Sequence, residues 1–96
     1  MSDARRFTVG IDAADGHRYW LTVALYQTAD QLQRAAQKHR PQHGGLDYWA
    51  NCGGCFQPHD NESTYLGIMR LCDEHLTAEV VIHESVHAAI AFTWKS

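Results

Sequence analysis

The run His83-Glu84-Ser85-Val86-His87, close to the C-terminus, constrains this chain more than any other feature because it is an HExxH motif. On a helix, positions i and i+4 lie on one face, so both imidazole rings can reach one metal ion. Glu84 then lies beside that ion, where its carboxylate can take a proton from a bound water molecule. The motif therefore predicts a helix that carries a metal-binding and acid–base site.

The segment around the motif has the composition of a buried helix. Thr77 is placed to cap its N-terminus, and Glu79 would lie in the first turn, where the helix dipole favours an acidic group. The apolar side chains of the segment are Val80, Val81, Ile82, Val86, Ala88, Ala89, Ile90, Ala91 and Phe92. A helix that is apolar nearly all round is expected to be buried on most sides.

Two histidines and a glutamate buried on such a helix need compensation, which a divalent cation supplies. Zinc (Zn2+) suits the pattern best, because it favours nitrogen ligands and a low coordination number. A catalytic zinc usually has three protein ligands, and His83 and His87 are only two. The nine residues after His87 contain no usual zinc ligand. The third ligand must therefore come from upstream, from another chain or from sequence that is not present.

The rest of the chain predicts a small sheet and a second helix. Aromatic and β-branched residues in alternating patterns indicate strands, and Thr28 is placed to cap a helix. The predicted strands are Phe7–Ile11, Arg18–Tyr26, Leu46–Phe56 with a possible bulge at its glycines, and Thr64–Cys72; the helix runs from Thr28 to about His39, and Gln57–Ser63 is a polar loop. We therefore expect one α+β domain over residues 1–96. It has a mixed, mostly antiparallel sheet of about four strands, a backing helix and a C-terminal HExxH helix.

Composition excludes several classes of protein. A length of 96 residues and a hydrophobic fraction of 45% indicate one small folded domain. The net charge of −3 argues against a nucleic-acid partner or an anionic membrane surface. No apolar run approaches the roughly 20 residues of a membrane-spanning helix, and the N-terminal residues lack the apolar core of a signal peptide. We therefore expect a cytoplasmic protein.

Three cysteines fit a reducing compartment, because an odd number without an export signal argues against a disulfide framework. Cys52 and Cys55 have the spacing of zinc ligands, and Cys72, His59 and His43 could complete a second, structural site. The alternative is that the pair consists of small strand residues flanking a glycine bulge, which a lone CxxC favours. Cys55 and Cys72 are also candidates for the third ligand at the helix.

With these elements in place, the chain resembles the N-terminal half of a zincin metallopeptidase domain, particularly the small zincin-like proteins of bacteria and their phages. That family places a backing helix before a mixed sheet, ends the sheet with an edge strand, and follows it with the HExxH helix. The segment from about Arg18 to Phe92 matches this order. The resemblance implies that His83 and His87 are zinc ligands and that Glu84 is the general base.

The resemblance also implies a substrate-binding edge. The strand Thr64–Cys72 would pair with an extended peptide or protein substrate by β-augmentation. The residues of that edge would be Tyr65, Leu66, Gly67, Ile68 and Met69. The third ligand of the family, a Glu, His or Asp, normally lies on a downstream segment that has no counterpart here.

Two functional hypotheses follow. The first is a zinc-dependent metallopeptidase, in which water activated by zinc hydrolyses a peptide bond. The second is a non-catalytic module with a zincin fold that binds a partner or forms a homodimer, with the third ligand missing or supplied by a partner chain. Glu84 favours the first, because a purely structural metal site does not need it. The short stretch after His87 favours the second.

Overall fold

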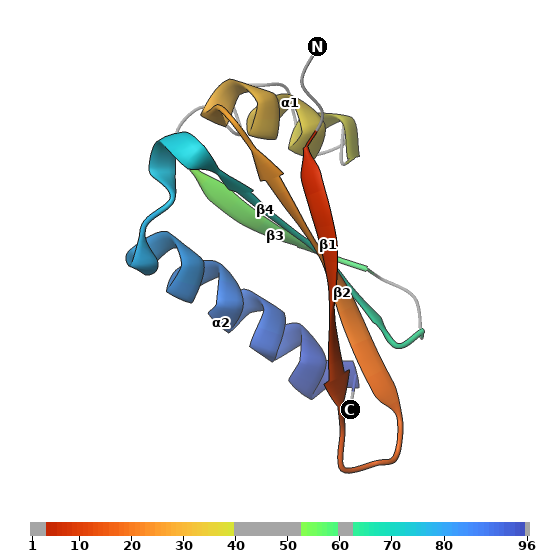
Figure 1. Ribbon diagram of the computed structural model, residues 1–96. Coiled ribbons are helices and arrows are strands. Elements are labelled where there is room, and N and C mark those ends of the chain that lie inside the picture. Colours follow the sequence, from red (N-terminus) through yellow and green to blue (C-terminus); the bar gives the residue numbers. More distant parts are fainter. Residues whose placement is uncertain (1–3, 40–52, 60–62, 96) are drawn as a thin grey trace.

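A four-stranded mixed sheet lies between two helices in the computed structural model of this protein, which describes residues 4–39, 53–59 and 63–95 (Figure 1). The elements are β1 (Arg5–Asp12), β2 (Arg18–Tyr26), α1 (Ala29–His39), β3 (Gly54–Pro58), β4 (Tyr65–Cys72), the short 3-10 helix η3 (Asp73–His75) and α2 (Ala78–Lys95). The strand order is β1-β2-β4-β3. Strands β2 and β4 run parallel, and the other neighbouring pairs are antiparallel. The predicted α+β fold class is confirmed.

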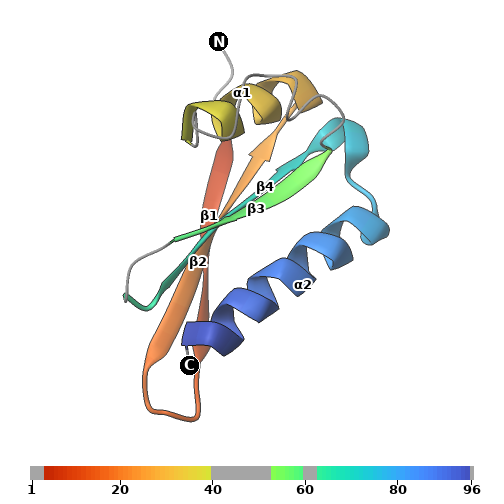
Figure 2. The same cartoon turned by 180° about the vertical axis from the view of Figure 1, so that it is seen from behind.

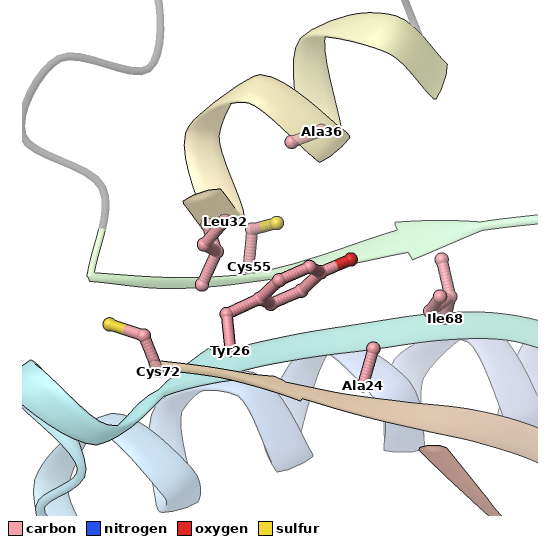
Figure 3. Close-up of a cluster of buried hydrophobic side chains, with 7 residues drawn as sticks. All are labelled: Ala24, Tyr26, Leu32, Ala36, Cys55, Ile68 and Cys72. Carbon is pink, nitrogen blue, oxygen red and sulfur yellow. The ribbon is translucent and has the colours of Figure 1, made fainter. Parts of the chain in front are cut away.

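Helix α1 covers one face of the sheet, which we call the α1 face. Leu32 and Ala36 of the helix are completely buried there. Their partners are Ala24, Tyr26, Cys55, Ile68 and Cys72, drawn from β2, β3 and β4 (Figure 3). Burial of this apolar set, at about 25 cal/mol per Å² removed from water, holds α1 on the sheet.

A polar network lies within the α1 face and is fully paired. The guanidinium of Arg70 donates from Nε to the side-chain oxygen of Gln57 at 2.7 Å and from Nη1 to the hydroxyl of Tyr26. Gln57 donates in turn to the carbonyl oxygen of Ala36 at 3.0 Å. Because buried polar groups are costly when unpaired, this network fixes how α1 is seated over β3 and β4.

Helix α2 lies on the opposite face, the α2 face. The buried side chains there are Tyr19, Leu21, Val23, Leu66, Met69, Leu71 and Ala88. Figure 2 shows α2 running obliquely beneath the sheet, with its C-terminal end near the β1–β2 hairpin. The two helices therefore occupy different sides of one sheet, which makes three layers.

Strand β4 contains an extra residue near its start. Trp20 of β2 pairs with Tyr65 and Leu21 pairs with Gly67, so Leu66 has no partner in the register. Gly67 has a φ of 138°, and a Cβ atom there would lie 2.3 Å from the carbonyl oxygen of Gln57. Only glycine fits this bulge, because L side chains avoid such φ values and the neighbouring backbone is too close.

The predicted helix starts are confirmed. Thr28 accepts a hydrogen bond from the backbone N–H of Gln31 at 3.2 Å, and the Gln31 side chain accepts one from the N–H of Thr28 at 3.3 Å. Thr77 accepts one from the N–H of Val80 at 3.2 Å. Each threonine satisfies an N–H group that the helix itself leaves unpaired.

The predicted third strand is confirmed over Gly54–Phe56, but the prediction was wrong about where it ends. Strand β3 begins at Gly54 and continues through Gln57 and Pro58, which were expected to form a loop. The polar Gln57 is in a strand because its amide is paired on both sides within the α1 face. Pro58 is compatible with an edge strand. The part of the predicted strand from 46 to 52 lies outside the described residues.

The expected substrate edge was also wrong. The residues Tyr65, Leu66, Gly67, Ile68 and Met69 belong to β4, which is paired with β2 on one side and with β3 on the other. The edges of the described sheet are β1 and β3. The reason is that β3 folds back on β4 as an antiparallel partner and covers the edge that β4 would otherwise present.

Candidate metal centre

Helix α2 is covered by the sheet on one side only, which corrects the expectation that it is buried on most sides. Its buried residues are Glu84, Ala88 and Ala91. Ile82 and Val86 remain 63% and 52% exposed. The four-stranded sheet covers one side of the helix, so the apolar side chains on the other side remain exposed to solvent. The two motif histidines are likewise exposed, and Glu84 is the one buried residue of the motif His83–His87.

His83 and His87 lie one turn apart and bring their Nε2 atoms to 3.3 Å. Their ring planes are nearly perpendicular, at 82°. Two nitrogens at this separation can both lie about 2.0–2.1 Å from one zinc ion, and the angle at the ion is then roughly 104–111°, close to tetrahedral. The pair therefore fits two ligand positions of a tetrahedral ion.

The same arrangement also suits the protein without a cation. One neutral imidazole can donate from Nε2 while the other accepts, which gives an N–H···N hydrogen bond at the observed 3.3 Å. Both rings lie on the solvent side of α2, with the His83 side chain 68% exposed. An ion can reach the two nitrogens from solvent without any change in the backbone.

Glu84 points from the same turn toward the sheet. Its residue is 6% exposed, and its Oε2 atom lies 4.0 Å from Nε2 of His83. This is too far for both groups to share a hydrogen bond and close enough for a water molecule to bridge them. A carboxylate so poorly solvated is stabilised by a nearby positive charge, which a cation held by the histidines would supply.

Gly54 makes room for Glu84 and its helix. A Cβ atom on Gly54 would lie 2.7 Å from Cγ1 of Val80 and 3.5 Å from Cγ of Glu84. A Cβ atom on Gly53 would lie 3.0 Å from Cβ of His75. The two glycines therefore let the start of β3 pass close to α2 and η3, which places the motif helix directly against the edge strand.

A depression of about 160 Å³ lies beside His87, between α2 and β3. Its lining is Phe56, Pro58, His87, Ile90, Ala91 and Trp94. Trp94, seven residues after His87, therefore lies on the same side of the helix as this histidine, and the residue is 84% exposed. The depression is mainly apolar and could receive one side chain next to the histidine pair.

The far end of α2 is anchored by Tyr19. Its ring meets Phe92 edge to face at 5.2 Å, and its hydroxyl donates to the Asp15 carboxylate at 2.8 Å and lies 3.2 Å from the carbonyl oxygen of Lys95. Hydrogen bonds from the backbone N–H of His17 and from the Tyr19 hydroxyl hold the pKa of Asp15 below its ordinary value. The bond to this carboxylate raises the pKa of Tyr19. These contacts fix the helix that carries the motif.

The structure does not bring the other candidate ligands to the histidine pair. Cys55 and Cys72 are buried in the α1 face, across the sheet from His83 and His87. The ring of His59 packs against Tyr65 at 5.2 Å. Cys52 and His43 lie outside the described residues, so the second zinc site is not tested. Within the described ranges, no group of three or more His, Cys, Asp or Glu side chains could hold an ion.

The sequence analysis did not predict that Gly53 and Gly54 allow close packing against α2 and η3, or that β3 is an edge strand beside the motif. The adjacent pair Gly53-Gly54 was interpreted as a possible bulge, whereas the missing side chains serve close packing against Val80 and His75. The signal was present, since consecutive glycines in a strand often mark a close approach of another backbone or element. Nothing in the sequence indicated which element approaches.

No helix in the part of the chain that the structure describes is long and apolar enough to cross a membrane. Compared with known proteins, the chain matches no protein-family model, no curated protein sequence and no solved structure.

Proposed function

We propose that this chain is a zinc-dependent metallopeptidase that hydrolyses peptide bonds in a peptide or protein substrate. The observation that carries the proposal is the 3.3 Å separation of the His83 and His87 Nε2 atoms, with Glu84 next to them. A zinc ion at this position would lower the pKa of a bound water to about 7 and polarise a substrate carbonyl group. The two histidines would each bind the ion through Nε2, because these two atoms are close enough to share one ion.

Glu84 has the position of a general base. Its carboxylate lies on the sheet side of the histidine pair, so a water molecule between the two groups lies within reach of Oε2. Glu84 would take a proton from this water and later donate it to the leaving amine. Because the residue is only 6% exposed, bulk solvent competes weakly for its hydrogen bonds.

The substrate would lie along β3, on the side of the depression between β3 and α2, and not along β4. The depression beside His87 adjoins Phe56 and Pro58 of β3 and could hold one substrate side chain while the scissile carbonyl faces the histidines. An apolar lining favours an apolar side chain at that position. This placement supports the peptidase proposal because the depression adjoins His87 and the Glu84 carboxylate lies near His83, so the two flank the histidine pair.

A second function is favoured by a different observation. Among the described residues only the two histidines meet, whereas a catalytic zinc usually has three protein ligands. A non-catalytic module that binds a partner or forms a homodimer would not need a complete zinc site within this chain, because the partner chain would supply the further ligands. In that case Glu84 would be a buried counter-charge and not a base.

Zinc content and peptide hydrolysis separate the two functions in three proteins: the wild type, Glu84→Gln and His83→Ala. The peptidase predicts that Glu84→Gln keeps its zinc and loses at least about 100-fold in rate, since general-base catalysis contributes roughly 10²–10⁴-fold. His83→Ala should lose both zinc and activity. A wild type that binds zinc with no hydrolysis supports the module, and a wild type that takes up no zinc removes both metal-dependent functions.

Ser85→Ala is the matched control. Ser85 lies within the motif run but its side chain faces the apolar depression on the β1 side of α2, away from His83 and His87. This variant should keep both the zinc and the rate of the wild type. A loss of activity in Ser85→Ala equal to that of Glu84→Gln would show that the assay reports damage to the helix and not loss of the base.

A further inference from the structure

Strand β1 forms an open edge of the sheet. Among the described strands it pairs only with β2, and seven of its eight residues are exposed. It contains no proline, and its register with β2 runs without a shift from Arg5 to Asp12. Natural proteins usually protect such an edge with a proline, a bulge or a covering element. Within the described residues, the centre of this edge from Phe7 to Ile11 has no proline, bulge or charged side chain, so it is a template for another strand.

One side of β1 is apolar. Phe7, Val9 and Ile11 pair across from core residues of the α2 face, yet Phe7 is 56% and Val9 is 38% exposed. Val9 and Ile11 also line an apolar depression of about 360 Å³ together with Ala89 and Phe92 of α2. The apolar surface therefore continues from the motif helix to the edge of the sheet.

The other side of β1 is charged at its two ends. Arg6 and Asp12 lie on the α1 side of the strand, three residues before and three residues after Val9. If two β1 strands met antiparallel about a two-fold axis through Val9, Arg6 of each copy would lie opposite Asp12 of the other. The same register places Phe7 opposite Ile11 and Val9 opposite Val9, so the apolar sides also match.

We propose that β1 pairs with β1 of a second copy of this chain in this register, which joins the two four-stranded sheets into one. Neighbouring registers are poorer. An axis through Thr8 sets Arg5 opposite Ile11 and leaves Asp12 without a cation from the second copy. An axis through Gly10 sets Asp12 opposite Thr8 and leaves Arg6 beyond the paired residues, so charge complementarity favours the axis through Val9 over both neighbours.

The existing contacts of Asp12 are compatible with this pairing. Arg18 donates from Nη1 to Oδ1 of Asp12 at 2.8 Å, and its guanidinium passes over Gly10, where a Cβ atom would lie 2.3 Å from Nη2. The second carboxylate oxygen of Asp12 can accept from Arg6 of the second copy. The absent side chain of Gly10 is what allows Arg18 to reach Asp12 along the strand.

The proposed dimer does not depend on the proposed metal centre. Strand β1 is at one edge of the described sheet, and β3, which borders the histidine pair, is at the other. The dimer would therefore leave both metal centres open. Failure of zinc binding or hydrolysis would not affect the dimer, and absence of the dimer would not affect the metal centre.

Cysteine cross-linking tests the register. Opposite residues on paired strands have Cβ atoms about 4.5–5.5 Å apart, so Val9→Cys should form a disulfide-linked dimer under mild oxidation. Phe7→Cys is the matched control, because the two positions 7 would lie about 14 Å apart along the strands. The native cysteines are common to both variants. Equal cross-linking of the two variants, or a dimer formed by Thr8→Cys in place of Val9→Cys, would overturn the proposed register.

Charge exchange tests the pairing itself by measuring the mass of the full chain in solution over a dilution series. The wild type should be a dimer at the highest protein concentrations of this series. A wild type that is a monomer at every concentration would rule the dimer out. Arg6→Asp or Asp12→Arg alone should weaken dimerisation about tenfold, because two exposed opposite-charge contacts become like-charge contacts. An equimolar mixture of the two variants should recover a mixed dimer. A mixture as weak as its components would contradict the Arg6–Asp12 contact.

Discussion

The two faces of the sheet are built in different ways. The α1 face is closed, with Leu32 and Ala36 completely buried and with Arg70, Gln57 and Tyr26 joined in a paired polar network. The α2 face also buries apolar side chains, but the solvent side of its helix leaves Ile82, Val86, Ile90 and Trp94 exposed beside the two motif histidines. Both faces bury apolar side chains, but the reactive groups lie on the solvent side of α2, where side chains can stay exposed without loss of the fold.

The largest difference between the buried side of α1 and the solvent side of α2 should appear when one apolar side chain is shortened on each. Leu32→Ala on the α1 face is expected to lower the free energy of unfolding by about 2–5 kcal/mol, because it leaves a cavity at a completely buried site. Ile82→Ala on the α2 helix should change it by no more than about 0.5 kcal/mol, because the side chain is already exposed. Urea denaturation measures both. Similar losses in the two variants would mean that Ile82 is buried in solution.

A smaller effect tests where the α2 face is tight. Gly54→Ala should lower the free energy of unfolding by about 1–3 kcal/mol, because the new Cβ atom meets Val80. Adding Val80→Ala should recover part of this loss, since the two side chains then no longer compete for the same space. The coupling is measured by a double-mutant cycle in urea. Strictly additive losses would show that α2 and β3 are not in contact at Gly54.

The helix starts should show no difference between the faces. Thr28→Ala at α1 and Thr77→Ala at α2 are each expected to lower the free energy of unfolding by about 1 kcal/mol, because each removes the acceptor for one unpaired N–H group. Thr28→Ser and Thr77→Ser keep the acceptor and serve as controls. A loss at Thr77 well below that at Thr28 would indicate that the first turn of α2 frays even in the wild type.

The smallest effect concerns the anchor of α2. The pKa of Asp15 is lowered in the folded protein, so its contribution to stability is present above the unfolded value near 3.8 and is lost as the pH falls through the folded pKa. Asp15→Asn should reduce the decline in thermal midpoint between neutral pH and about pH 3. Asp30→Asn is a control on the exposed side of α1. An unchanged acid decline in Asp15→Asn would separate Asp15 from the stability of α2.

Much of the local structure was predictable because local patterns cause it. The hairpin β1–β2 follows from alternating aromatic and β-branched residues, and both helix starts follow from a threonine that accepts an N–H bond three residues on. The motif spacing likewise predicted that His83 and His87 would share one side of a helix. These features depend on residues that are near one another in the chain.

The predictions that were wrong concern features that depend on residues far apart in the chain. Strand β4 is interior because α1 crosses over to set it parallel to β2 while β3 folds back on its other side, and no pattern within β4 specifies its neighbours. The exposure of Ile82 and Val86 depends on how far the sheet extends beneath α2, which hydrophobic periodicity cannot reveal.

The bulge at Leu66 gives β4 one residue more than its pairing with β2 requires. Loss of this residue would leave Trp20 opposite Tyr65 and Leu21 opposite Gly67, so the strand would become regular while every later side chain kept its face. The cost would be an unfilled space where a completely buried leucine had been. A deletion at Met69 has no extra residue to absorb it. The alternation of the strand would then turn the charged Arg70 from the α1 face to the α2 face, or its pairing would shift. The strand should therefore tolerate the loss of one residue at its start better than the loss of one at its centre.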